Sequence, residues 1–164
     1  MLKTTMLTAA LVMAASGLAH AGGQEGTIGV GAEYQLSGLG GVSLNYDAGA
    51  FHVGGLLAYA DDRFADDYFT VAARFFYHVH STAMADFGVG GNFGIGSYQF
   101  GGMGDRATLV YLEPGFQIRL FVASNVALSF FGGVSIGVSD ADGVAIDGQG
   151  TGFGGGGGVH YYFF

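Results

Sequence analysis

Hydrophobic and polar residues alternate along most of the chain after residue 26. In residues 27–36, one face of an extended segment carries Ile28, Val30, Ala32, Tyr34 and Leu36, and the positions between them are small or polar. The same alternation recurs in seven further segments, namely residues 42–47, 51–60, 69–80, 86–96, 110–122, 126–137 and 151–164. A period of two is typical of β-strands with two different faces. The sequence therefore predicts an all-β fold with eight strands of about ten residues, a length that crosses a bilayer when tilted.

The connections between these segments alternate in length. Residues 47–49, 81–82 and 124–125 form short turns, whereas residues 60–67, 100–106 and 139–150 are longer and hold most of the acidic residues. The first connection, residues 37–41, is also short. Short turns at one end and longer loops at the other are typical of a membrane barrel. We therefore expect an antiparallel up-and-down meander with both termini at the short-turn end.

The bulk of the two faces indicates which one points outward. A soluble eight-stranded calyx such as a lipocalin would place its apolar face inside and its polar face in water. Here the apolar face consists of Phe, Leu, Ile, Val and Tyr, whereas the other face is mainly Gly, Ala and Ser with single polar residues. Only the second face fits into a lumen that barely admits side chains. The apolar face is therefore predicted to contact lipid, and the soluble calyx is the alternative.

Composition and charge narrow the range of functions. Hydrophobic residues make up 50% of the chain and charged residues 11%, with 33 glycines, one proline and no cysteine. This mixture excludes a disordered chain, and the absence of cysteine excludes disulfides and thiolate metal sites. Thirteen acidic against five basic residues give a net charge of −8. Because a nucleic-acid-binding protein needs a basic surface, no nucleic-acid partner is expected.

The N-terminus has the pattern of a secretory signal peptide. Lys3 precedes an apolar run at residues 6–15, and Ala19, His20 and Ala21 form an Ala-x-Ala cleavage site. The apolar run is too short for a membrane-spanning helix. We expect residues 1–21 to be removed and residues 22–164 to form the barrel domain. Loss of the single lysine changes the net charge from −8 to −9.

The chain resembles the small eight-stranded bacterial outer-membrane proteins, the group of the outer membrane protein A and X barrels and the opacity adhesins. The resemblance rests on the signal peptide, the eight alternating segments, the short turns and the aromatic C-terminus. Residues 112–116, Leu-Glu-Pro-Gly-Phe, and the turn at residues 123–125 add a local likeness. The chain departs from the group in lacking tryptophan and in its shorter loops.

This resemblance implies a location in the outer membrane with both termini in the periplasm. Its expected partners are outer-membrane lipid and lipopolysaccharide, the barrel-assembly machinery, and an unidentified surface ligand. Tyr162 and Phe164 are expected to belong to the membrane-insertion signal at the chain end, and His160 would face lipid if Phe164 does. We expect a structural or surface-interaction role and no enzymatic activity or cofactor. A narrow pore, or a route for an apolar molecule, is the alternative function.

Charged side chains on the small face are the candidate functional residues. We expect Arg74, Asp86, Glu113 and Arg119 to form an ion-pair network in the lumen, because buried charges must be paired. Arg74 and Glu113 are predicted to meet across Gly90, and Asp86 to lie near His78 and Arg119. The further polar residues predicted in the lumen are Glu33, Asn92, Gln117, His52, His78 and His80. Such a network either plugs the barrel or gates a polar pathway, and the plug is favoured because eight-stranded lumens are usually filled.

Three local motifs carry weaker signals for chemistry. His78 and His80, with His52 nearby, suggest a metal site, but hydrogen bonding within the lumen is the preferred interpretation and no metal is expected. The run from His78 to Ser81 invites comparison with barrel-type lipid A deacylases, but its spacing does not match. Residues 140–143, Asp-Ala-Asp-Gly, lack the remaining ligands of a calcium loop and are interpreted as a turn.

Proline and glycine also affect the expected strands. Pro114 lies in a central strand, where it cannot donate a hydrogen bond, so we expect a β-bulge there. The five glycines at residues 154–158 are expected inside the last strand, where they leave room for inward side chains of neighbouring strands.

Overall fold

The computed structural model of the chain describes residues 24–60, 67–99, 106–140, 143–147 and 153–163. Within this part of the chain, no helix is long and apolar enough to cross a membrane. The strands are β1 (Ile28–Tyr34), β2 (Gly40–Asp47), β3 (Phe51–Ala60), β4 (Asp67–Ser81), β5 (Ala85–Gln99), β6 (Ala107–Ala123), β7 (Val126–Gly133), β8 (Ser135–Ser139), β9 (Gly143–Asp147) and β10 (Gly154–Phe163).

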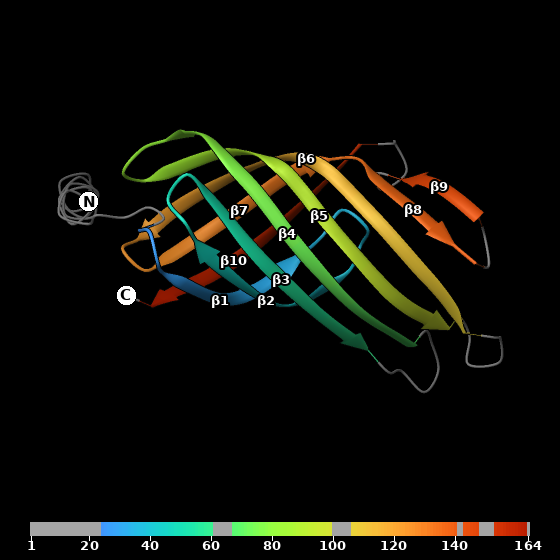
Figure 1. The fold of residues 1–164 in the computed structure, drawn as a ribbon. Helices are drawn as coiled ribbons and strands as arrows, with labels where there is room; N and C mark the ends of the chain where they lie inside the picture. Colours follow the sequence, from blue (N-terminus) through green and yellow to red (C-terminus); the bar gives the residue numbers. More distant parts are fainter. Residues whose placement is uncertain (1–23, 61–66, 100–105, 141–142, 148–152, 164) are drawn as a thin grey trace, which may run out of the picture.

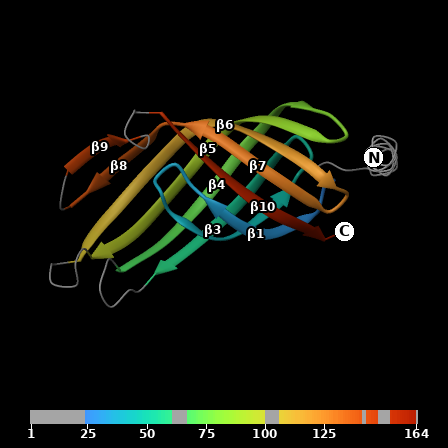
Figure 2. The same ribbon diagram turned by 180° about the vertical axis from the view of Figure 1, so that it is seen from behind.

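These strands close into a barrel (Figures 1 and 2). Each strand from β1 to β6 pairs with the next one in antiparallel fashion, and β10 pairs with both β7 and β1. β7 and β8 lie on β6 in one register on either side of Val134, so they form one barrel strand in two parts. The predicted eight-stranded antiparallel meander is therefore confirmed. β9 pairs with β8 as a hairpin, within a segment that the sequence predicted to be a loop.

The two ends of the barrel differ. Ile28 at the start of β1 pairs with Phe163 at the end of β10, so both terminal strands have their outer ends at the same end of the barrel. The β2–β3, β4–β5 and β6–β7 turns lie at this end, which we call the turn end (Figure 1). The other ends of β3, β4, β5 and β6 and the β8–β9 pair lie at the opposite end, which we call the loop end.

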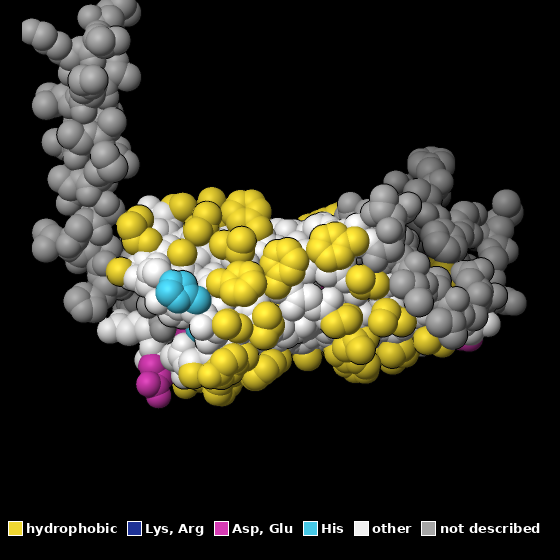
Figure 3. All heavy atoms as spheres, turned by 90° about the horizontal axis from the view of Figure 1, so that it is seen from above, with side chains coloured by type: hydrophobic (Ala, Val, Ile, Leu, Met, Phe, Trp, Pro, Cys, Tyr) yellow, Lys and Arg dark blue, Asp and Glu magenta, His cyan; other side chains and the backbone are white. Residues whose placement is uncertain are grey.

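The barrel has an apolar outer face and a polar interior. Large hydrophobic side chains are exposed on every described barrel strand, and Figure 3 shows them spread along the outer face. Among the buried residues in the described part of the chain, polar and charged ones outnumber hydrophobic ones by eighteen to eleven. A water-soluble barrel would have the reverse arrangement. The predicted orientation of the two faces is therefore confirmed.

Pro114 does not produce the predicted bulge. It pairs with Gly91 on β5 without a register shift, and β6 keeps one register with β7 and β8. The Val134 amide still donates to the Pro114 carbonyl at 3.2 Å, and only the reciprocal bond is missing. Among the described strands, register shifts occur instead near the turn end, between His78 and His80 and between Phe121 and Ala123.

Glycines make room for aromatic rings inside the barrel. Tyr111, Phe131 and Tyr162 each pair across neighbouring strands with a glycine, and their rings occupy the space that a Cβ atom there would need. The glycine partners are Gly94, Gly156 and Gly29, respectively. The glycine run at residues 154–158 lies at the start of β10, as predicted. The small face of the sequence is therefore filled by rings from adjacent strands.

Candidate functional site

The turn-end half of the interior is organised around one guanidinium group. Arg119 on β6 lies 2.6 Å from the carboxylate of Asp47 and 2.6 Å from that of Asp86. It also donates to the Tyr162 hydroxyl at 3.0 Å. All four side chains are buried. We call these residues the Arg119 cluster, in which a single positive charge balances two carboxylates from β2 and β5.

Two histidines extend the Arg119 cluster toward the turn end. His78 Nδ1 lies 2.8 Å from the Gly49 carbonyl, which can only accept, so this nitrogen carries the proton. His78 Nε2 lies 2.9 Å from His52 Nδ1. The Nη2 group of Arg119 is 3.4 Å from the same His78 nitrogen. Through these contacts the His78 ring anchors the β2–β3 turn to the interior.

A second cluster lies further from the turn end. Arg74 on β4 forms a salt bridge with Glu33 on β1, and both side chains are almost completely buried. Arg74 Nε also donates to Asn92 at 3.2 Å, and the Asn92 amide donates to Glu113 at 2.8 Å. Arg74, Asn92 and Glu113 are register partners on adjacent strands. We call Arg74, Glu33, Asn92 and Glu113 the Arg74 cluster.

The first connection of the chain covers the Arg74 cluster. The backbone amide of Ser37 donates to Glu113 at 2.6 Å, and the Tyr111 hydroxyl donates to Gln35 at 2.6 Å. Leu36 is only 4% exposed. The pattern predicted Leu36 on the outer apolar face, but β1 ends at Tyr34 and the following turn folds into the barrel. Residues 35–39 therefore cover the Arg74 cluster on the side of the loop end.

A third polar contact lies between β2 and β10. Ser43 Oγ and His160 Nε2 are 2.6 Å apart, and both residues are buried. The same nitrogen is 3.9 Å from the Glu33 carboxylate. Serine and histidine side chains at this distance resemble a nucleophile and its base, but both are sealed inside the barrel. Within the described residues, no group of three or more His, Asp or Glu side chains is arranged to hold a metal ion.

Comparison with solved structures supports the barrel fold. The N-terminal β-barrel domain of Pseudomonas aeruginosa OprF matches with a TM-score of 0.59 at 12% identity, over 85% of this chain and 98% of that domain. Ail, the attachment invasion locus protein of Yersinia pestis, matches with a TM-score of 0.39 at 17% identity, over 85% of this chain and all of Ail. No protein-family model matches the sequence, and no curated protein does.

The chain has the fold of an outer-membrane β-barrel. The similarity to the OprF domain shows the fold alone at 12% identity, and the inside-out distribution of side chains agrees with it. In barrels of this type the lumen holds the polar side chains and the outer face contacts lipid. The two clusters therefore occupy the position at which a channel or a plug would be built.

The sequence placed most of the interior residues on the correct face. Arg74, Asp86, Glu113 and Arg119 are buried, and so are the other predicted lumen residues Glu33, Asn92, Gln117 and His52. His78 is half-buried. The prediction that Arg74 and Glu113 meet across Gly90 is wrong. Asn92 is the register partner between them, and the carboxylate partner of Arg74 is Glu33.

His80 is the predicted lumen residue that lies elsewhere. It is exposed, because the bulge between His78 and His80 shifts the register of β4. His80 therefore pairs with the outward Phe87 instead of continuing the inward row. Bulges interrupt the period of two, and strict alternation does not reveal their position.

The side chains at the end of β10 alternate between the interior and the outer face. Tyr162 points into the barrel and binds Arg119, while Tyr161 and Phe163 are exposed. His160 faces inward, not toward lipid. Phe164, the other residue of the expected insertion signal, lies outside the described residues, as do residues 1–21.

Three of the interior contacts do not follow from the sequence pattern. The pattern puts Asp47 at the start of a turn, and it connects neither Gln35 with Tyr111 nor Ser43 with His160. The alternation does put Asp47 and Ser43 on the small, polar face of β2. It does not show which residue they meet, because the partners lie on other strands.

Proposed function

We propose that the protein is a small integral outer-membrane barrel with a closed polar interior and a structural or surface-interaction role. The observation that carries this proposal is the combination of an apolar outer face with two buried charge clusters that fill the lumen. The outer face requires a lipid environment, because soluble proteins rarely expose apolar surface on this scale. Both termini then lie in the periplasm, on the side of the short turns.

The closed interior favours a plug over an open channel. Each buried arginine is bound to carboxylates from other strands, which ties opposite walls of the barrel together. The turn at residues 35–39 adds a backbone hydrogen bond to Glu113 over this network. An open pore would need hydrated charges with free space around them. Here the guanidinium groups also pack against aromatic rings, with Arg74 5.5 Å from the Phe131 ring centroid and Arg119 5.0 Å from that of Phe121.

The loop end is the part that would meet the cell exterior. Among its described residues, Arg106 and Asp67 form an exposed ion pair at 3.8 Å, and the Asp140 carboxylate accepts from the Thr108 amide at 2.8 Å. We propose that the partners of the protein are outer-membrane lipid, lipopolysaccharide, the barrel-assembly machinery and a surface ligand. No catalytic role and no cofactor is proposed, because the Ser43 and His160 pair has no access to substrate.

The proposal is tested with Arg74→Gln and Glu113→Gln in phospholipid vesicles and planar bilayers, with Glu25→Gln as a control at an exposed carboxylate. Wild type should give a gel band whose mobility changes on boiling, and no steady conductance. Both lumen variants should unfold at lower urea concentration without acquiring ion-selective conductance, and the control should match wild type. A wild-type protein that stays folded and soluble without detergent would contradict the membrane assignment.

A narrow pore is the second candidate function. It is favoured by buried polar atoms that have no hydrogen-bond partner in the structure, on Asn45, Gln117 and Ser129. The interior residues of the two clusters also include two arginines and four carboxylates, so such a pathway would favour cations. Under this alternative, Arg74→Gln changes conductance while the urea midpoint hardly moves. That result would show that the Arg74 cluster gates a pore and does not serve as a structural plug.

A further inference from the structure

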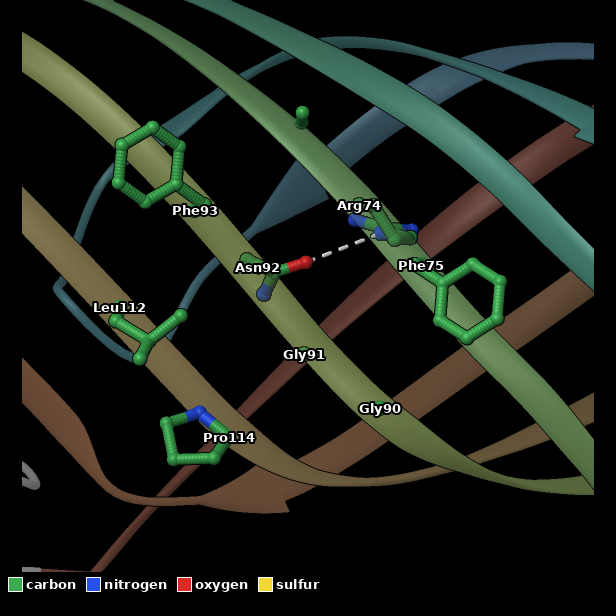
Figure 4. Close-up of a pocket in the computed structure, with 9 residues that line it drawn as sticks. Arg74, Phe75, Gly90, Gly91, Asn92, Phe93, Leu112 and Pro114 are labelled. Atoms are coloured by element: carbon green, nitrogen blue, oxygen red, sulfur yellow. Dashed lines mark hydrogen bonds between the residues drawn. The ribbon is translucent and has the colours of Figure 1, made fainter.

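The outer wall of the barrel contains a depression across β4, β5 and β6. Its volume is about 360 Å³, at the small end of the range of ligand pockets. Figure 4 shows Phe75, Phe93, Leu112 and Pro114 placed around the stretch of β5 at Gly90 and Gly91. We call this depression the wall groove.

The wall groove follows from the residues that meet at Gly91. Its register partners are Phe75 on β4 and Pro114 on β6, so a position without a side chain lies between two rings. Ala73, the partner of Phe93, is also small and outward-facing. A Cβ atom on Gly91 would collide with the backbone of Glu113, so the close packing of β5 on β6 requires this glycine. The groove is therefore a fixed feature of the wall.

The lining indicates a hydrocarbon occupant. Phe75, Phe93 and Leu112 are 48%, 54% and 49% exposed, so the groove opens outward between apolar side chains. The two polar residues that reach it, Arg74 and Asn92, are bonded to each other and to Glu33 and Glu113. Both residues are also buried, so the open side of the groove presents apolar side chains and no exposed polar group to a headgroup. A chain of methylene groups fits these surroundings.

The position along the strands points to the chain of a membrane lipid. Arg74 and Asn92 each occupy the middle position of their fifteen-residue strands, so the groove lies at half the height of β4 and β5. Acyl chains occupy this depth in a bilayer. The exposed lining carries no cation for the phosphates of lipopolysaccharide, so a phospholipid is the source of the chain in the groove, while lipopolysaccharide is the proposed partner at the loop end. We propose that the wall groove holds one acyl chain of a phospholipid more firmly than the rest of the barrel wall does.

The inference rests on the proposed membrane location and is tested with Ala73→Leu. Leucine at this position fills the groove from its β4 side without touching the close β5–β6 contact. Ala32→Leu is the matched control, because Ala32 is an outward, exposed alanine on β1 that does not line the groove. Native mass spectrometry of protein released from phosphatidylethanolamine nanodiscs should show one retained phospholipid on wild type and on the control. Ala73→Leu should retain at least fivefold less.

A second measurement does not depend on Ala73→Leu folding. The chain has no tryptophan, so Phe93→Trp introduces a single indole at the rim, and Val42→Trp places one on the outer face away from it. Brominated acyl chains should quench the rim indole at least twofold more strongly. Equal quenching together with equal lipid retention overturns the inference.

Two other outcomes separate this inference from the proposed function. Retention of a second copy of the chain in place of lipid overturns the acyl-chain assignment and makes the groove a dimer contact. A protein that gives a heat-modifiable band in vesicles but retains no lipid overturns the groove inference alone. A protein that does not insert into vesicles overturns the proposed function, and the groove inference with it.

Discussion

Arg119→Met removes the one positive charge of the Arg119 cluster and retains an unbranched side chain of similar length. In the native barrel, this guanidinium lies 2.6 Å from both Asp47 and Asp86. Without it, two carboxylates face each other in a space closed to solvent. The hydrogen bond that would remain to Asp47 comes from the Gly49 amide, whereas the side-chain hydrogen bonds to Asp86 come from Arg119 and would be lost. We expect the variant to fold into a less stable barrel.

The expected loss follows from the number of broken contacts. Removing one partner of a buried ion pair typically costs ~3–5 kcal/mol, mainly because the other charge stays buried without compensation. Arg119 forms ion pairs with two carboxylates and also donates to Tyr162. The loss of unfolding free energy should therefore lie at the upper end of this range, at about 4–5 kcal/mol. Most single domains have a total stability of ~5–15 kcal/mol. The change is therefore large enough to measure without preventing folding.

A triple variant separates the charge effect from packing. Arg119→Met with Asp47→Asn and Asp86→Asn leaves no charge in the cluster and nearly the same side-chain volume. With no charge left in the cluster, the uncompensated buried charge that makes a broken ion pair so costly is absent. The triple variant should thus recover most of the loss and lie within ~2 kcal/mol of wild type.

The assay is equilibrium unfolding by urea in phospholipid vesicles, followed by circular dichroism and by the heat-modifiable band. Equal slopes of free energy against urea are required for the comparison, because a changed slope indicates a changed unfolded or folded state. A loss below ~1 kcal/mol for Arg119→Met would refute the reasoning, because surface ion pairs contribute this little. So would a triple variant as unstable as the single one, because the cost would then come from packing.

Three further variants or probes test other parts of the structure. Gly94→Ala places a methyl group where the Tyr111 ring now lies and should lower the free energy of unfolding in urea by ~1–3 kcal/mol. Gly55→Ala is its control and should be nearly neutral, because the nearest atom to the added methyl group is a backbone oxygen at 3.4 Å. Leu57→Arg, on the exposed outer face, should cost ~2–4 kcal/mol in a bilayer, and an unchanged urea midpoint would indicate a water-facing surface. Diethyl pyrocarbonate should modify His80 in the folded protein and leave His52 unmodified until unfolding, as mass spectrometry of peptides would show.

The barrel could be predicted because its main determinant is local. The alternation of apolar and polar residues shows which face of each strand points outward, and in a closed barrel every strand has one outward and one inward face. Some contacts between neighbouring strands can also be predicted from the sequence. Asp86 and Arg119 lie on strands joined in the expected meander, so approximate turn positions place them together. A shift of two residues in a turn changes such partners, which is why Asn92 and not Gly90 stands between Arg74 and Glu113.

Interruptions of the alternation were harder to locate. The bulge at His78 and His80 depends on how β4 bends toward the β4–β5 turn, and no residue type marks it. Pro114 carries a strong sequence signal for a bulge, yet the ladder accommodates it by losing one hydrogen bond. Proline lacks only the donor on one side, and its carbonyl still accepts from Val134. A missing bond and a bulge are different solutions to the same constraint, and the sequence does not distinguish them.

Contacts across the lumen are the part that alternation does not determine. Glu33 and Arg74 lie on β1 and β4, and Asp47 and Arg119 on β2 and β6, so no strand register brings either pair together. Their approach depends on the diameter and tilt of the closed barrel, which are properties of all eight strands at once. The alternation shows that these charges point inward, and closure decides which of them meet.

The closure of the loop-end side is the clearest case of this limit. The donor to Glu113 is the backbone amide of Ser37, so any residue except proline at that position offers the same hydrogen bond. What the sequence does specify is a short connection after β1, with Gly38 at a positive φ of 83° that lets the chain fold back toward the lumen. The proposed plug therefore depends on the length and backbone of one turn more than on the identity of its side chains. For this reason, the short β1–β2 connection, an exception to the pattern of long loops, is the element that covers the Arg74 cluster.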